Sequence, residues 1–216
     1  MINIYCIPGL GTDERLFSKL KLKNAEIEFI TWVKPDKKDD ITSYAEKLIP
    51  QIDLSLPFAL LGVSLGGILA VELSSKINPQ KVFVISSLKS SKEFPFYIRF
   101  FKWMRVKYLI SAWLLKNSKP LIQLLFGRMN ASDKSLIYKM IDEADDIFTP
   151  WAAKAIIEWE SKDTETPFEK IVQIVGDKDL IFNYVDLKKC HVIKDGTHMM
   201  ILNKTHLIST IVDQNL

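Results

Sequence analysis

Residues 62–66 read Gly62-Val63-Ser64-Leu65-Gly66 and join two segments of different character. Residues 57–61 (PFALL) are apolar, as in a buried strand, and residues 67–73 (GILAVEL) have the composition of a helix. A serine between a strand and a helix, with a glycine two residues away on each side, is typical of a turn that presents a nucleophile. The first N–H groups of such a helix point back toward the serine and favour negative charge beside it. Ser64 is therefore a candidate nucleophile.

The pentapeptide by itself also fits a glycine-rich turn without a chemical role, so the chain must also supply an acid and a base. Residues 176–181 (GDKDLI) follow an apolar run at 170–175, and residues 195–200 (DGTHMM) follow another at 190–193. Both turns lie at the carboxyl ends of predicted strands, the edge at which open parallel sheets place their active sites. The order serine, acid, histidine is the one expected after a nucleophile of this kind.

Two aspartates, Asp177 and Asp179, are the candidate acids in the first of these turns, and His198 is the candidate base in the second. The aspartate that is not the acid would hydrogen-bond to the backbone of its own turn. His191 and His206 fall within a predicted strand and a predicted helix, so we expect them to be packed or solvated.

Apolar runs alternate with helical patterns along most of the chain. We expect strands at about 2–7, 26–33, 58–63, 81–86, 170–175 and 190–193, and helices at about 41–52, 65–77, 151–161 and 199–212. Ser43 and Glu46 are spaced as a capping box in the first helix, and Thr149-Pro150 predicts the start of the third. Such alternation predicts a parallel sheet covered by helices on both faces.

Residues 88–148 interrupt this alternation. They contain no convincing strand, and helical segments are expected at about 95–106, 108–115, 120–125 and 132–143. The predicted organisation is therefore a core made of residues 1–87 and 149–216, with residues 88–148 as a helical insertion.

Taken together, these motifs resemble the α/β-hydrolase superfamily, in particular small bacterial-type serine hydrolases with a helical lid. The likeness covers nearly all of the chain outside the insertion. It implies a three-layer α/β/α fold with about six mostly parallel strands and a helical lid inserted after the strand at 81–86. It also implies that Ser64 is the nucleophile and His198 the base. The family places the acid at the fourth position of a G-x-x-D turn, which favours Asp179 over Asp177.

The resemblance also implies an oxyanion hole made by two backbone N–H groups. Leu65 would supply one, and Leu10 in the loop at 7–13 (IPGLGTD) would supply the other. This loop is similar to the H-G-x-G loop of the family, with Pro8 where histidine is common. The candidate substrate-binding residues in this loop, which also fit a plain turn, are Gly9, Gly11 and Thr12.

The first part of the insertion is aromatic and basic. Its aromatic residues are Phe94, Phe96, Tyr97, Phe100, Phe101, Trp103, Tyr108, Trp113 and Phe126. An aromatic inner face of the lid would receive an apolar group, with Phe101 and Trp103 as candidate substrate contacts. A basic outer face would attract an anionic substrate, an acyl carrier's phosphopantetheine or an anionic membrane surface. Alternatively, the aromatic residues only pack on the core and the lysines only keep the segment soluble.

Composition limits the other classes of function. The chain has 216 residues, 48% of them hydrophobic, and a net charge of +3, which is ordinary for one globular domain and too low to suggest nucleic-acid binding. No apolar run has the length of a membrane span, and the N-terminus lacks the features of a signal peptide. Cys6 and Cys190 are expected to be free thiols, as in a cytoplasmic protein. We expect the protein to be a monomer or homodimer.

The function predicted from these features is that of a serine hydrolase that cleaves a carboxylic ester or thioester through an acyl-enzyme on Ser64. No metal or organic cofactor is expected, because the chain itself supplies the nucleophile, the base and the oxyanion donors. Two alternatives stay open. The same fold could serve lyase, cofactorless oxygenase or C–C hydrolase chemistry, or the protein could bind lipid or a membrane surface without catalysis.

Overall fold

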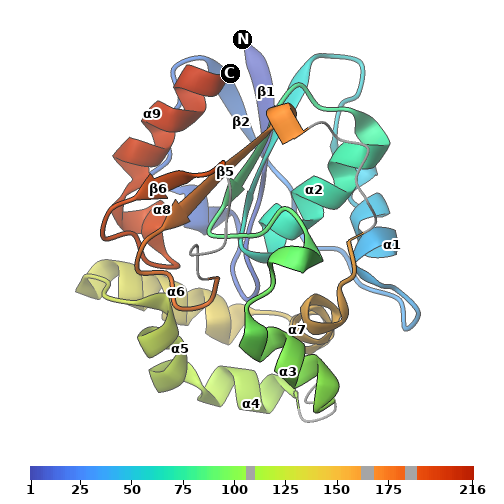
Figure 1. The fold of residues 1–216 in the computed structure, drawn as a ribbon, viewed down its shortest axis with the longest axis vertical. Coiled ribbons are helices and arrows are strands. Elements are labelled where there is room, and N and C mark those ends of the chain that lie inside the picture. The colour runs from blue at the N-terminus through green and yellow to red at the C-terminus, as the bar shows by residue number, and fades with distance from the viewer. Residues whose placement is uncertain (106–109, 162–167, 183–188) are drawn as a thin grey trace.

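A single parallel sheet forms the centre of the computed structural model, which describes residues 1–105, 110–161, 168–182 and 189–216. The strands lie in the order β2-β1-β3-β4-β5-β6, and every neighbouring pair is parallel (Figure 1). Their bounds are β1 (Ile2–Ile7), β2 (Ala25–Phe29), β3 (Phe58–Val63), β4 (Val82–Ile85), β5 (Ile171–Gly176) and β6 (His191–Ile193). The prediction of six mostly parallel strands is confirmed.

Helices cover both faces of this sheet, because side chains alternate along each buried strand. On β1, Tyr5 and Ile7 pack into one apolar cluster, and Ile4 and Cys6 pack into another. The first cluster is completed by α1 (Ile41–Glu46), α2 (Leu65–Ile77) and α7 (Phe148–Glu158). The second is completed by the 3-10 helix η1 (Glu14–Phe17), α6 (Ala131–Glu143), α8 (Met200–Asn203) and α9 (Thr205–Asn215). The predicted three-layer α/β/α fold is therefore confirmed.

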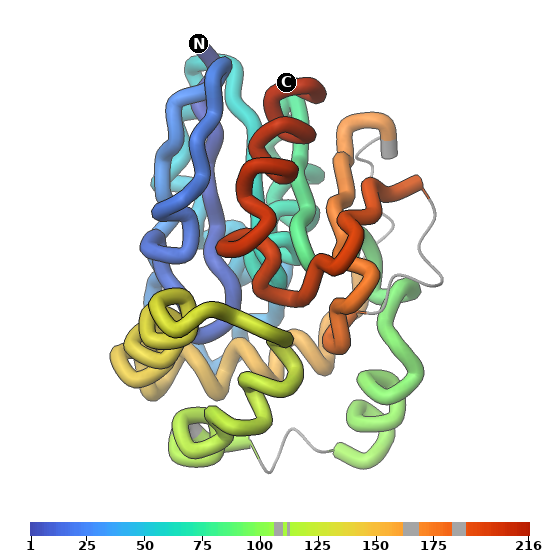
Figure 2. The backbone as a smooth tube through the Cα atoms, turned by 90° about the vertical axis from the view of Figure 1, so that its left-hand side faces the viewer, coloured from blue at the N-terminus to red at the C-terminus, as the bar shows by residue number. Residues whose placement is uncertain are grey.

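Between β4 and β5 the described residues form helices and no strand. These are η3 (Ser91–Glu93), α3 (Phe96–Trp103), α4 (Ala112–Asn117), α5 (Lys119–Phe126), α6, α7 and η5 (Phe168–Lys170). Figures 1 and 2 show α3 to α6 beyond the carboxyl ends of the strands, at the end of the molecule opposite both chain termini. Parts of two predicted helices, including Val106 and Tyr108, lie outside the described residues.

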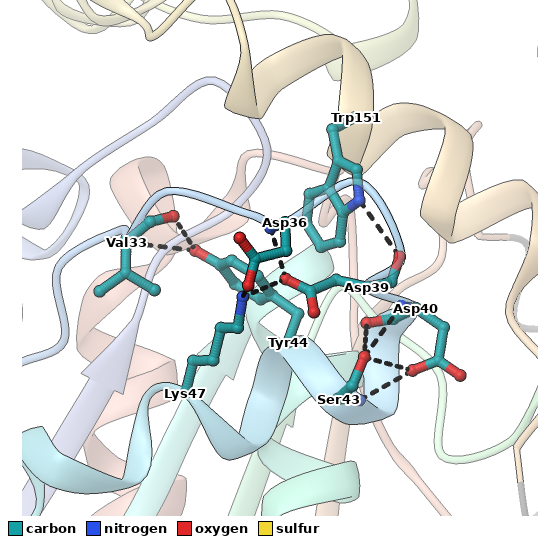
Figure 3. A network of polar contacts seen from close by, with 8 residues as sticks. All are labelled: Val33, Asp36, Asp39, Asp40, Ser43, Tyr44, Lys47 and Trp151. Carbon is teal, nitrogen blue, oxygen red and sulfur yellow. Dashed lines mark hydrogen bonds and ion pairs between the residues drawn. The ribbon is translucent and has the colours of Figure 1, made fainter.

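The predicted helix at 41–52 is shorter than expected. It ends at Glu46 and is followed by the 3-10 helix η2 (Ile49–Gln51), because Pro50 has no N–H to donate to Glu46. The predicted capping box was also wrong. Asp40 is the N-cap, Ser43 N donates to its carboxylate at 2.8 Å, and Asp40 N donates to Ser43 Oγ at 3.0 Å (Figure 3).

The helix predicted to start at Thr149-Pro150 begins earlier, at Phe148. The Asp145 carboxylate accepts hydrogen bonds from the N–H groups of Ile147 and Phe148, at 2.8 and 2.6 Å. The indole of Trp151 then donates to Asp39 O at 3.3 Å, which ties α7 to the loop before α1 (Figure 3). Similarly, the predicted last helix is two helices, α8 and α9, because Lys204 between them leaves the helical conformation.

Within the described ranges, no helix combines the length and the apolar character needed to cross a bilayer. Cys6 and Cys190 are free thiols, the first buried and the second half-buried.

Candidate active site

Ser64 occupies the turn between β3 and α2 in a backbone conformation, φ 54° and ψ −118°, that side chains rarely adopt. The turn is packed too closely for side chains on its glycines. A Cβ at Gly62 would lie 2.0 Å from Gly66 O, and a Cβ at Gly66 would lie 2.0 Å from Ile7 O. Ser64 N also donates to Ile85 O at 3.0 Å. The turn is therefore fixed by the neighbouring strands, and it holds the serine hydroxyl at the carboxyl edge of the sheet.

His198 reaches Ser64 from the turn after β6. Its Nε2 lies 3.0 Å from Ser64 Oγ. The two side chains come from positions 134 residues apart, and both are buried, with 2% of His198 and 9% of Ser64 exposed. The candidate nucleophile and the candidate base are thus within hydrogen-bond distance of each other.

Asp179 holds the other side of the imidazole. His198 Nδ1 lies 2.9 Å from Asp179 Oδ2 and 3.1 Å from Oδ1, and Oδ1 also accepts from the N–H groups of Ile181 and Phe182. Burial by itself would raise the pKa of Asp179. Attraction to His198, its hydrogen bond and the two backbone donors outweigh burial and hold this pKa below its usual value. An ionised Asp179 keeps the proton on Nδ1, so Nε2 is free to accept from the serine.

The structure places Asp179, and not Asp177, against His198. Asp177 N donates to Ile193 O at 3.2 Å, and its buried Oδ1 has no hydrogen-bond partner within the described part of the chain. His191 on β6 and His206 on α9 are both exposed.

The loop after β1 runs directly beside Ser64. A Cβ at Gly9 would lie 3.4 Å from Ser64 Cβ, and the N–H and hydroxyl of Thr12 both donate to Gly9 O, at 3.2 and 2.9 Å. These bonds close the loop without using the Leu10 N–H. Leu65 opens α2, so its N–H has no partner within that helix. The two predicted oxyanion donors therefore come from the segments that flank the serine.

A small cavity of about 130 Å³ adjoins this loop. Gly11, where φ is +69°, and Thr12 line it together with the stacked rings of Trp32 and Phe148. The indole of Trp32 donates to Thr12 O at 2.8 Å, which fixes the wall of the cavity relative to the loop.

Two aromatic rings lie against His198, and sequence reasoning did not assign them to the site. Phe126, at the end of α5, stacks on the imidazole with ring centroids 5.5 Å apart, and Phe182 meets it edge-on at 5.7 Å. Gly127, which follows Phe126, has φ +82° and lies so close to Thr197 that a Cβ on this glycine would be 2.5 Å from Thr197 Cγ2. The helical segment thus touches the turn that carries His198 at Phe126 and Gly127. The sequence carries no local signal for this contact beyond the glycine.

The two candidate substrate contacts on α3 lie farther out. Phe101 is 41% exposed and packs on Tyr97, whose hydroxyl donates to Ile181 O beside Asp179. Trp103 is 74% exposed and packs on Phe100. In the part of the chain that the structure describes, no ring contact or hydrogen bond joins Phe101 or Trp103 to Ser64 or His198. In the same part, no group of three His, Cys, Asp or Glu side chains is arranged to bind a metal ion.

No protein-family model matches the sequence, and no curated protein matches it closely enough to indicate a family. Solved structures do match its fold. A hydrolase from Oleispira antarctica is 14% identical with a TM-score of 0.71, and the match covers 99% of this chain and 90% of that one. An esterase from Thermogutta terrifontis is 12% identical with a TM-score of 0.69, over 99% and 89% of the two chains.

A bromoperoxidase from Bacillus anthracis is 16% identical with a TM-score of 0.69, over 99% and 91% of the two chains. Proteins described as an esterase and a bromoperoxidase are thus similar to this chain to the same degree, so likeness of fold does not decide the reaction. Together with the parallel sheet and the serine turn, these matches show that the chain has the α/β-hydrolase fold.

Proposed function

We propose that the protein is a serine hydrolase that cleaves a carboxylic ester or thioester through an acyl-enzyme on Ser64. The observation that carries this proposal is the continuous hydrogen-bonded chain from Asp179 through His198 to Ser64 Oγ, buried at the carboxyl edge of the sheet. A protein that only bound lipid would not need a strained serine in hydrogen-bond contact with an oriented imidazole.

In the first half of the reaction, Ser64 Oγ attacks the carbonyl carbon of the substrate while His198 Nε2 takes the hydroxyl proton. The tetrahedral intermediate then collapses, the bond to the leaving oxygen or sulfur breaks, and His198 gives its proton to the leaving group. Water repeats the sequence on the acyl-enzyme and releases the acid. Asp179 stays ionised throughout and stabilises the imidazolium.

Charge on the carbonyl oxygen would be stabilised by the N–H groups of Leu10 and Leu65. Both belong to segments that lie against the serine, and α2 directs the positive end of its dipole to the same point. Loss of one such donor typically costs about 10²–10³ in rate.

Residues 88–148 would act as a lid on a core of residues 1–87 and 149–216. The contact of Phe126 with His198 supports this role, since a ring on the imidazole excludes water from the base. The substrate contacts proposed in the loop after β1 are Gly9, Gly11 and Thr12. Gly9 lies against Ser64, and Gly11 and Thr12 line the small cavity on this loop. For Phe101 and Trp103, which are exposed on α3, contact with substrate would require this helix to move.

The test is a panel of p-nitrophenyl esters and acyl-CoA thioesters of increasing chain length, assayed with the purified protein. We expect turnover of at least one substrate and a fall in kcat of about 10⁴ or more for Ser64→Ala. Ser74→Ala, which removes a buried hydroxyl farther along α2, is the matched control and should keep its activity. Activity that survives in Ser64→Ala would contradict the proposal.

The same panel separates the proposal from other chemistry on this fold. A protein that reacts with a fluorophosphonate at Ser64 but turns over no ester or thioester would instead support lyase, oxygenase or C–C hydrolase activity.

A further inference from the structure

The face of α3 that points away from the core carries a stripe of aromatic side chains. Phe96, Phe100 and Trp103 are exposed by 78%, 42% and 74%, respectively. Neighbouring rings in this stripe have centroids 6.4 and 5.8 Å apart. At about 100° per residue, the three positions centre on the side of the helix opposite Ile98, which is buried. We refer to Phe96, Phe100 and Trp103 as the aromatic stripe.

The segment of the chain that carries the aromatic stripe is basic. Residues 94–132 include seven Lys or Arg and no Asp or Glu, although the net charge of the whole chain is only +3. Three lysines of this segment are neutralised by acids from outside it, in the pairs Lys102–Glu160, Lys116–Asp146 and Lys119–Asp142. Arg99, beside the stripe, and Arg105, just after α3, are exposed and carry the local positive charge.

The neighbouring helices present further apolar side chains at the same end of the molecule. Trp113 on α4 is 72% exposed, and Leu121 and Leu124 on α5 are 55% and 66% exposed. Figures 1 and 2 both show α3, α4 and α5 together at the end opposite the chain termini. Exposed apolar side chains gathered at one end of a protein are typical of an interaction site.

We propose that the aromatic stripe docks on an anionic lipid surface. Phe and Trp rings partition into the headgroup region of a bilayer, and arginines beside them are attracted to anionic headgroups. The stripe is the outer face of a helix and has no hydrogen-bonding group except the Trp103 indole, so it offers a protein partner little specificity. Docking would turn the carboxyl edge of the sheet, where Ser64 lies, toward the lipid.

The test uses Ser64→Ala protein, in which lipid cannot be cleaved, and co-sedimentation with vesicles of phosphatidylcholine alone or mixed with phosphatidylglycerol. We expect binding to the mixed vesicles and an affinity at least about tenfold lower for the triple variant Phe96→Ser, Phe100→Ser, Trp103→Ser. The matched control is the double variant Leu54→Ser, Leu56→Ser. Both leucines are also exposed, but they precede β3 and so lie at the amino ends of the strands. This control should bind unchanged.

The contribution of charge has its own pair of variants. Arg99→Gln, Arg105→Gln should weaken binding to the mixed vesicles by about fivefold for each charge removed. Lys21→Gln, Lys23→Gln removes two positive charges before β2, at the opposite edge, and should leave the affinity unchanged.

A third measurement does not use the triple variant and so does not depend on how that variant folds. Lipids brominated near the headgroup should quench the tryptophan fluorescence of the Ser64→Ala protein, and Trp103→Phe should lose part of this quenching while it still binds. The proposal is overturned if this protein does not bind mixed vesicles or is not quenched, a result that would leave an acidic protein as the partner of the stripe. It is also overturned if the triple variant binds as well as its parent, a result that would place the contact with lipid elsewhere on the protein. Because Ser64 is already replaced, none of these outcomes depends on hydrolysis.

Discussion

The strain at Ser64 can be measured by replacing this serine with glycine and with alanine. A side chain in the conformation φ 54°, ψ −118° costs about 1–3 kcal/mol, whereas glycine tolerates it. Glycine loses about 0.5–1 kcal/mol more backbone entropy on folding. Ser64→Gly should therefore exceed Ser64→Ala in free energy of unfolding by about 0.5–2 kcal/mol. Both variants lack the hydroxyl that contacts His198, so the loss of that hydrogen bond cancels in the comparison.

Ser74 is the matched control, because it is also buried but lies inside α2. There the order should reverse, with Ser74→Ala more stable than Ser74→Gly by about 1 kcal/mol. Urea denaturation followed by far-ultraviolet circular dichroism gives all four free energies. If alanine equals or exceeds glycine at position 64, the serine turn is not strained and the reasoning fails.

Four further outcomes are expected. Gly127→Ala should lower the free energy of unfolding by about 2–4 kcal/mol, because φ is positive there and the new Cβ would overlap Thr197. In the double variant with Thr197→Gly, part of this loss should be recovered. Strictly additive free energies in the double-mutant cycle would contradict the contact. Asp179→Asn should lower kcat/KM by about 10⁴. Because folding lowers the pKa of Asp179, the ionised carboxylate should contribute its full stability above about pH 4 and lose it as the pH falls below that value. The Tm of the wild type should therefore approach the Tm of Asp179→Asn in acid. A difference in Tm that stays constant with pH would exclude this linkage. Phe126→Ala should lower kcat/KM by about tenfold or more, because its ring packs on His198. Phe96→Ala, which removes an exposed ring of α3, should leave kcat/KM unchanged. Equal effects of the two variants would show that the ring on His198 has no role in the reaction.

Most of the sheet could be predicted from the sequence because a parallel strand buried on both faces is a continuous apolar run. Residues 58–63 and 81–86 are of this kind, and the structure has strands at Phe58–Val63 and Val82–Ile85. The helix after the serine was predicted at 65–77, and in the structure it spans Leu65–Ile77, directly after the turn. The same runs pointed to Ser64, to His198 and to an acid at Asp177 or Asp179, because each lies in a turn that follows a strand-like run. The choice of Asp179 came from the family resemblance.

Helix ends were harder to predict, because several nearby side chains can cap the same helix. Asp40 rather than Ser43 caps α1, and Asp145 starts α7 before the expected Thr149-Pro150 pair. Contacts across the fold left even less trace. Phe126 meets His198 from 72 positions away in the chain, and apart from the neighbouring Gly127 nothing in the local sequence distinguishes this ring from the other aromatic residues of the insertion.

The chemistry at Ser64 is tested most directly by site-resolved mass spectrometry after reaction with a fluorophosphonate. The account predicts one adduct per chain, located at Ser64, with much slower labelling in His198→Ala and no labelling in Ser64→Ala. Folded protein that takes up no probe, or takes it up equally when Ser64 is alanine, would contradict the proposal that this serine is a nucleophile activated by His198.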